Sequence, residues 1–352
     1  MDKLAETINK GAHNLIYPFE VIPEPGKMLK IEDGVYWVRM RLPFVLDHIN
    51  LWVLSDGDGW TIVDTGVASA EIKENWRQCF SEDMDAKKVK KVIVTHLHPD
   101  HIGLAGWINK KFSAPLFMSR TDYLMCRVLV SDTGKEAPTE GKKLYRSAGF
   151  SEGDLDIYSE RFGGFGSAIS KLPESYNRLK DRDIITIGKY DWEIVVGSGH
   201  CPEHLCLYNK ELKIFISGDQ VLPRITSNVS VFPTEPLSNP LEDWIDSCKY
   251  IKTRVPNDVL VLPSHNEPFR GLHERLDHLI NGHEKSLDRL LELCNEPKKA
   301  VEVFSVLFKR KITSDLLLMA TGESIAHLNC LVSRGLVNSE KDEKGIISYT
   351  KI

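Results

Sequence analysis

Short apolar segments alternate with turn residues in the first part of the chain, between about residues 28 and 65. The segments 34–39, 49–54 and 60–64 are short and rich in β-branched and aromatic side chains, which is typical of β-strands. Between the last two segments, the run Asp56-Gly-Asp-Gly is typical of a tight turn. We therefore predict that this part of the chain is a β-meander.

Strands and helices then alternate. The predicted elements are a helix at 70–80, a strand at 89–94, a helix from about 100, a strand at 115–118 and a helix at 121–130. Strands are predicted again at 192–196, 205–208 and 213–217, followed by a helix at 241–254 and a strand at 258–262. Both halves thus run from strands to helices, which predicts an α+β fold in which two packed sheets are flanked by helices, an αβ/βα sandwich.

The remaining segments are predicted to surround this sandwich. Residues 131–182 are rich in Gly, Ser, Glu and Lys and are predicted to form a partly helical inserted cap. We expect an N-terminal extension at 1–27, a main domain at 28–270 and a connecting helix at 271–296. Short helical segments and a hairpin pattern predict a winged-helix-like domain at 297–352.

Composition is that of an ordinary soluble protein, with 42% hydrophobic and 27% charged residues and a net charge of −5. This charge gives no global attraction to nucleic acids or to anionic membranes. The seven cysteines are scattered and form no CxxC pair, which favours free thiols in a reducing compartment. Because the start of the chain has no apolar signal segment, we expect a cytoplasmic protein.

The strongest chemical signal is the run Thr-His-Leu-His-Pro-Asp-His at residues 95–101. His96 and His98 are two apart in an extended segment, so both imidazoles point the same way. Pro99 then turns the chain, and Asp100 and His101 fall at the start of the predicted helix. Four potential ligands within six residues predict a metal site.

Three further candidate ligands stand just after predicted apolar strands. They are His200, Asp219 and His265, each with Gly or Ser beside it. In a sandwich these strand ends could converge on one edge and complete a set of seven ligands.

The chain resembles the metallo-β-lactamase superfamily, whose five motifs appear here in order. They are Asp64-Thr-Gly, the His96–His101 run, Gly199-His200, Ser217-Gly-Asp219 and Ser264-His265. The resemblance implies that His96, His98 and His200 hold one metal and that Asp100, His101 and His265 hold the other. It also implies that Asp219 bridges the two metals, that Asp64 orients a ligand, and that His204 supports the site without ligating.

Nitrogen and oxygen donors without thiolate suit zinc, which we expect at two ions per chain, although manganese and iron are also possible. The expected reaction is attack of a metal-bound hydroxide on an ester, thioester or lactone of a small molecule, with Asp100 orienting the nucleophile and passing on its proton. Cys201, next to His200, is interpreted as a buried structural thiol.

Two other functions of the superfamily remain open. One is a ribonuclease of the LACTB2-like kind, whose winged-helix tail the segment from Ile325 to Val337 resembles. From Pro297 onward the chain has nine Lys and Arg against six Asp and Glu, a mild excess that does not favour nucleic acid. The other is a mononuclear-iron persulfide dioxygenase. For partners, we expect a small-molecule substrate and no membrane, and a homodimer remains open.

Overall fold

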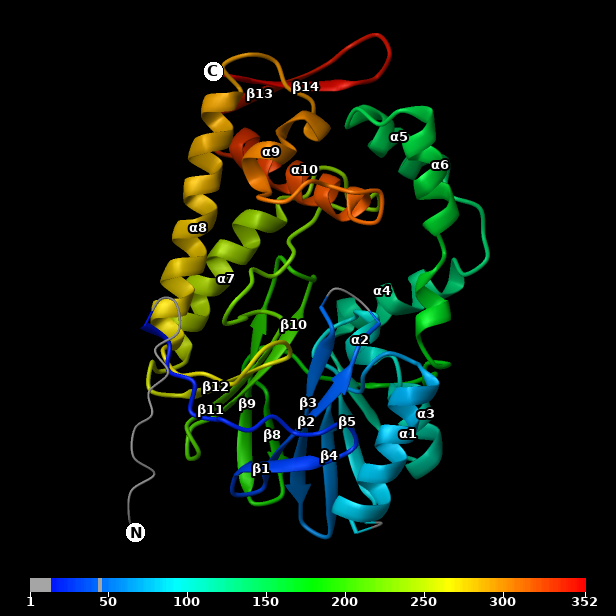
Figure 1. Ribbon diagram of the computed structural model, residues 1–352, viewed down its shortest axis with the longest axis vertical. Coiled ribbons are helices and arrows are strands. Elements are labelled where there is room, and N and C mark those ends of the chain that lie inside the picture. Colours follow the sequence, from blue (N-terminus) through cyan, green and yellow to red (C-terminus); the bar gives the residue numbers. More distant parts are fainter. Residues whose placement is uncertain (1–13, 44–45, 86) are drawn as a thin grey trace.

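Two mixed β-sheets lie in the lower half of the view in Figure 1 and pack face to face. The computed structural model describes residues 14–43, 46–85 and 87–352. The first sheet contains β1 (Met28–Glu32), β2 (Val35–Arg41), β3 (His48–Asp56), β4 (Gly59–Val63), β5 (Val89–Ile93), β6 (Leu116–Met118) and β7 (Asn177–Arg178), in that order. The second sheet contains β8 (Ile184–Ile187), β9 (Tyr190–Gly197), β10 (His204–Asn209), β11 (Ile214–Gly218) and β12 (Leu260–Pro263).

The two sheets are held together by a core of large apolar side chains that alternate along the strands. Trp37 and Trp52 of the first sheet stack with ring centroids 6.2 Å apart and share this core with Trp192 of the second sheet. All three indoles are almost completely buried, and burying an aromatic side chain contributes about 2–3 kcal/mol of stability. The predicted α+β sandwich is therefore confirmed.

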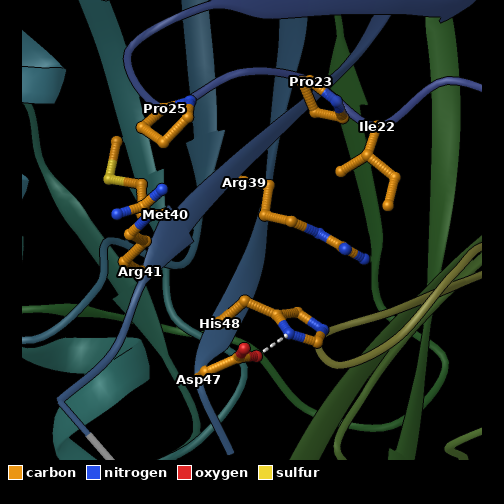
Figure 2. Close-up of a pocket in the computed structure, with 8 residues that line it drawn as sticks. All are labelled: Ile22, Pro23, Pro25, Arg39, Met40, Arg41, Asp47 and His48. Atoms are coloured by element: carbon orange, nitrogen blue, oxygen red, sulfur yellow. Dashed lines mark hydrogen bonds and ion pairs between the residues drawn. The ribbon is translucent and has the colours of Figure 1, made fainter.

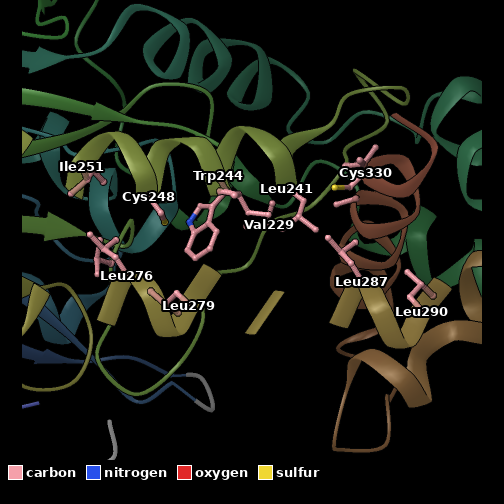
Figure 3. Packing of buried hydrophobic residues seen from close by; sticks show 14 of the residues in the cluster. Val229, Leu241, Trp244, Cys248, Ile251, Leu276, Leu279, Leu287, Leu290 and Cys330 are labelled. Carbon is pink, nitrogen blue, oxygen red and sulfur yellow. The ribbon is translucent and has the colours of Figure 1, made fainter. Parts of the chain in front are cut away.

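Helices cover the outer face of each sheet. The helices over the first sheet are α1 (Ala70–Gln78), α2 (Pro99–Ile102), α3 (Ala105–Phe112) and α4 (Arg120–Ser131). The helices over the second sheet are α7 (Pro240–Arg254) and α8 (Leu272–Leu293). Figure 3 shows how Leu241 and Trp244 of α7 meet Leu279 and Leu287 of α8 in one continuous apolar cluster.

The C-terminal segment packs on this second layer of helices. It comprises a 3₁₀ turn (Ala300–Val303), α9 (Phe304–Leu307), α10 (Leu317–Ser333) and the hairpin of β13 (Val337–Lys341) and β14 (Ile347–Lys351). Cys330 of α10 lies in the cluster drawn in Figure 3. Arg334, directly after α10, forms ion pairs of 2.8 Å with Glu242 of α7 and 2.7 Å with Glu284 of α8.

Helix α10 runs without a break from Leu317 to Ser333. Gly322 lies inside this helix, where glycine lowers helix propensity by about 1 kcal/mol relative to alanine. A Cβ at this position would lie 2.9 Å from Cβ of Ser230 and from the carbonyl oxygen of Val231. Close packing against the neighbouring segment therefore explains the glycine.

The segment predicted as a cap contains α5 (Thr139–Ser147) and α6 (Glu152–Arg161), which stand beside the C-terminal segment in Figure 1. These helices have a small core of their own, formed by Tyr145, Phe150, Leu155 and Tyr158. Contact with the C-terminal segment is direct, since Arg161 donates a hydrogen bond of 2.8 Å to the carbonyl oxygen of Asp315.

All seven cysteines are free and buried. The helices of the described part of the chain are each too short or too polar to cross a membrane.

Candidate metal centre

The histidine-rich run lies where β5 leaves the first sheet and α2 begins. Thr95 and His96 follow the strand and are fully buried. His98 is the N-cap residue of α2 and Pro99 is its first residue, so the chain changes from extended to helical between the second and third candidate ligands. As predicted from the spacing, the strand-to-helix junction places Asp100 and His101 in the first turn.

The first group of candidate ligands contains three imidazoles and one carboxylate, all with ligand atoms within 4.8 Å of one another: His96, His98, His200 and Asp219. Nε2 of His96 lies 2.9 Å from Nδ1 of His98 and 3.2 Å from Nε2 of His200. Oδ2 of Asp219 lies 3.6 Å from Nε2 of His200.

The second group contains Asp100, His101 and His265. Oδ2 of Asp100 lies 3.7 Å from Nε2 of His101 and 3.5 Å from Nε2 of His265. Oδ1 of Asp219 also faces this group, at 3.3 Å from Nε2 of His265. Asp219 therefore presents one oxygen to each group, so the seven predicted side chains form one continuous site.

The Nε2 atoms of His96 and His200 face each other as lone pairs. Nδ1 of His200 donates to the carbonyl oxygen of Asn228 at 2.7 Å, which leaves Nε2 without a proton in the neutral ring. The hydroxyl of Thr95 donates to Asp64 at 2.8 Å, so it can only accept from Nδ1 of His96, 3.0 Å away. His96 then also presents an unprotonated Nε2. Two lone pairs 3.2 Å apart repel each other unless a cation lies between them.

The pKa values of the histidines differ between the two groups of candidate ligands. Burial, reinforced by the neighbouring imidazoles, holds the pKa values of His96 and His98 well below the usual range, so these rings stay neutral. Burial also opposes charge on His101, but the carboxylates of Asp100, Asp64 and Asp219 outweigh it and raise the pKa of His101. Nε2 of His101 and Oδ1 of Asp219 are both buried without a hydrogen-bond partner. The residues therefore fit divalent metal ions, with imidazole and carboxylate donors of the kind that zinc, manganese and iron accept.

Hydrogen bonds from the surrounding residues fix the orientation of the candidate ligands. Oδ2 of Asp64 accepts from Nδ1 of His101 at 2.8 Å, so this imidazole turns Nε2 toward the site. Asp64 has a left-handed φ of 61°, which points to a tight local turn. Nε2 of the fully buried His204 accepts from the backbone N–H of Asp219 at 3.0 Å, so His204, whose ring also stacks on that of His96, orients the loop rather than serving as a ligand.

His48 supports the loop that carries His265 and was not identified from the sequence. Its carbonyl oxygen accepts from Nδ1 of His265, and its Nε2 accepts from the backbone N–H of Asn266, both at 2.8 Å. The other side of His48 lines a surface pocket of about 230 Å³ together with Arg39 and Asp47 (Figure 2). Arg39 also donates to the carbonyl oxygen of Asn266, so the pocket wall and the His265 loop are joined.

Asp122 connects the two loops that carry the first group of ligands, and sequence reasoning missed it as well. From its buried position on α4, Oδ1 accepts from the backbone N–H of Leu97 at 3.0 Å, and Oδ2 accepts from that of Glu203 at 2.8 Å. The buried thiol of Cys201 also bonds to this carboxylate, which places Cys201 in a structural role. No local pattern marks Asp122, because its partners lie 25 and 81 residues away.

Fold and site together define a metallo-hydrolase of the metallo-beta-lactamase superfamily, and the chain belongs to this family. The sequence model of the superfamily matches residues 45–293, and a model of the metallo-beta-lactamase-like C-terminal domain matches residues 287–352.

Three similar proteins illustrate this relationship, and each matches most of this chain. A solved beta-lactamase domain protein from Burkholderia ambifaria is 36% identical, with a TM-score of 0.88 over 97% of this chain and 99% of that chain. The probable metallo-hydrolase YqjP of Bacillus subtilis is 21% identical over 87% of this chain and 95% of its own length. The acyl-coenzyme A thioesterase MBLAC2 of Homo sapiens is 23% identical over 71% of this chain and 84% of its own length.

Proposed function

We propose that the protein is a two-metal hydrolase, with zinc as the expected metal, that cleaves a small-molecule ester, thioester or lactone. The convergence of two donor groups on the two oxygens of Asp219 is the observation that carries this proposal. A pair of divalent cations, when bound, lowers the pKa of water toward about 7 and polarises the carbonyl group of a substrate.

The chain's own residues divide the remaining work. His96, His98 and His200 would hold one metal, Asp100, His101 and His265 the other, and Asp219 would contact both. The side chain of Asp100 is 20% exposed, against 11% for Asp219. Asp100 can therefore reach water at the edge of the site, orient it for attack and take up its proton.

Among the three bond types, a thioester is our first choice of substrate. The similarity to a protein named as an acyl-coenzyme A thioesterase supports this choice. Cys201, next to His200, does not act as a competing nucleophile in this proposal, since burial and the charge of Asp122 raise its pKa well above the usual value and keep it as a thiol.

We expect protein purified without added metal to contain close to two zinc ions per chain, because each donor group supplies three or four ligands. Elemental analysis of the dialysed protein measures this directly. Hydrolysis of acyl thioesters, aryl esters and lactones would then be compared at equal substrate concentration.

One iron ion per chain, with oxygen uptake in the presence of thiol substrates, would replace the hydrolase proposal by an oxidoreductase. Fewer than 0.1 metal ions per chain after reconstitution with zinc would contradict any metal-dependent function.

A further inference from the structure

Helix α10 of the C-terminal segment reaches the candidate metal centre through one intermediate residue. Oε2 of Glu323, on this helix, accepts a hydrogen bond of 2.9 Å from the side-chain amide of Asn228. The backbone carbonyl of Asn228 accepts from Nδ1 of His200 at 2.7 Å. Three residues that are far apart in the sequence thus form a continuous chain of hydrogen bonds that ends on a candidate ligand.

Asn228 is fixed by further contacts with α10 and its own segment. Its side-chain oxygen accepts from the hydroxyl of Ser230 at 2.8 Å, so both ends of the amide are engaged. The backbone N–H of Val231 donates to the carbonyl oxygen of Gly322 at 3.0 Å, which docks the segment on the helix. The absence of a side chain at Gly322 permits this approach, since a Cβ there would lie 2.9 Å from Cβ of Ser230.

The direction of the His200 bond determines what this network does. A carbonyl oxygen can only accept, so the bond requires the proton on Nδ1 and leaves the lone pair on Nε2. Nε2 is the atom that faces His96, 3.2 Å away. A network that fixes Asn228 therefore fixes both the tautomer and the ring orientation that a metal ligand needs.

We propose that Glu323 is a positioning residue for the candidate metal centre, acting through Asn228 to hold the His200 imidazole with Nε2 directed at the first group of ligands. The metal-binding part of this inference rests on the proposed function, whereas the tautomer of His200 is a property of the metal-free protein. In this proposal the C-terminal segment does more than pack on the main domain, because it orients a candidate metal ligand.

The charge of Glu323 is not needed for this role. Burial raises the pKa of its carboxyl group to about 7, opposed by the hydrogen bond from Asn228. In either protonation state an oxygen remains available to accept from the amide of Asn228. A glutamine at this position also offers an oxygen, so Glu323→Gln should preserve what Glu323→Ala removes.

A general loosening of the C-terminal segment must be separated from this specific effect. Arg334 provides the matched control, because it joins the same segment to Glu242 and Glu284 and makes no contact with Asn228 that the described structure records. Arg334→Met should lower the midpoint of thermal unfolding without changing the His200 ring. Glu323→Ala should change the ring even at temperatures where the protein is fully folded.

The first test measures the two-bond ¹⁵N–¹H correlations of histidine side chains in the metal-free full-length protein, with the His200 signal assigned by His200→Gln. We expect Nδ1–H in the wild type, in Glu323→Gln and in Arg334→Met, and a mixture of tautomers in Glu323→Ala. A purely Nδ1–H ring in folded Glu323→Ala would overturn the inference, whatever metal the protein binds.

The second test measures zinc affinity by competition with a chromophoric chelator. We expect the zinc ion held by the first group of ligands to be lost about 10–100-fold more readily from Glu323→Ala, and no more than about twofold more readily from Arg334→Met. Asn228→Ala should match Glu323→Ala, and the double variant should lose no more than either single one. Equal losses of zinc affinity in Glu323→Ala and Arg334→Met would overturn the inference, because they would show that Glu323 only helps to dock the C-terminal segment. Absence of zinc binding in the wild type would instead contradict the proposed function.

Discussion

Asp219→Ala is expected to abolish zinc binding and hydrolysis together. Asp219 is the only one of the seven candidate ligands whose ligand atoms face both groups, at 3.6 Å from His200 and 3.3 Å from His265. Without it, neither cation retains its full set of donors, and the negative charge between the two positions is lost. Because metal activation contributes several kcal/mol to such reactions, we expect kcat/KM to fall by about 10³-fold or more.

The control for this variant is Asp258→Ala, which also removes a carboxylate near the second sheet. Asp258 is exposed and pairs with Lys213 rather than with a candidate ligand. This variant should keep its zinc and its activity. Metal content and thioester hydrolysis are measured on both proteins once their far-ultraviolet circular dichroism spectra have been shown to agree with that of the wild type. A folded Asp219→Ala protein that retained two zinc ions and wild-type activity would disprove the contact with both metals.

The candidate ligands could be predicted from the sequence because they occur in strong local patterns. The run from His96 to His101 is dense in donors and follows an apolar strand. Asp219 directly follows β11, and His265 is the second residue after β12; the two strands are parallel neighbours in the second sheet. Parallel strands bring the residues after their carboxyl ends to the same edge, so each of these positions could be read from one short segment.

The supporting residues were not accessible in this way, because their partners are distant in the sequence. Asp122 lies on a helix that looks ordinary in its periodicity, and its carboxylate meets two backbone N–H groups from different loops. Glu323 meets Asn228 across 95 residues, and Gly322 looks like a helix break unless the segment that packs on it is known. Such contacts depend on the packing of whole elements, which no local pattern specifies.

Strands at the sheet edges were missed for a related reason. β1 is the edge strand of the first sheet, and none of its five residues is fully buried. β8 is the edge strand of the second sheet and alternates exposed with buried positions over four residues. β1 therefore buries little apolar surface, and its hydrophobic pattern is weak compared with that of β3 or β10, whose residues are nearly all buried. β8 has the strand-forming sequence Ile-Ile-Thr-Ile, but it is only four residues long and is therefore a shorter signal than β3 or β9.

The second large effect is expected at Asp122, whose carboxylate joins the loop of His96 and His98 to the loop of His200. Alanine at this position would leave the buried N–H group of Leu97 and the partly buried N–H group of Glu203 without acceptors. Each unsatisfied buried donor costs about 1–3 kcal/mol, so we expect Asp122→Ala to lower the free energy of unfolding by about 3 kcal/mol. Zinc affinity should fall by about 10–100-fold, because the three imidazoles are no longer held in one arrangement.

The variant Asp122→Asn helps to separate the loss of folding stability from the loss of zinc affinity. Asparagine keeps one oxygen acceptor but turns an amide donor toward the second N–H, so both losses should be smaller than in the alanine variant. Burial raises the pKa of Asp122 to about 6 although four hydrogen bonds oppose it, so ionisation at pH 7 itself costs stability. Chemical denaturation of the metal-free protein and chelator competition of the zinc form measure the two effects. If Asp122→Ala lost stability but bound zinc as tightly as the wild type, the carboxylate would hold the fold together without organising the metal centre. Parallel losses across the alanine and asparagine variants would show that the fold and the metal centre depend on the same hydrogen bonds.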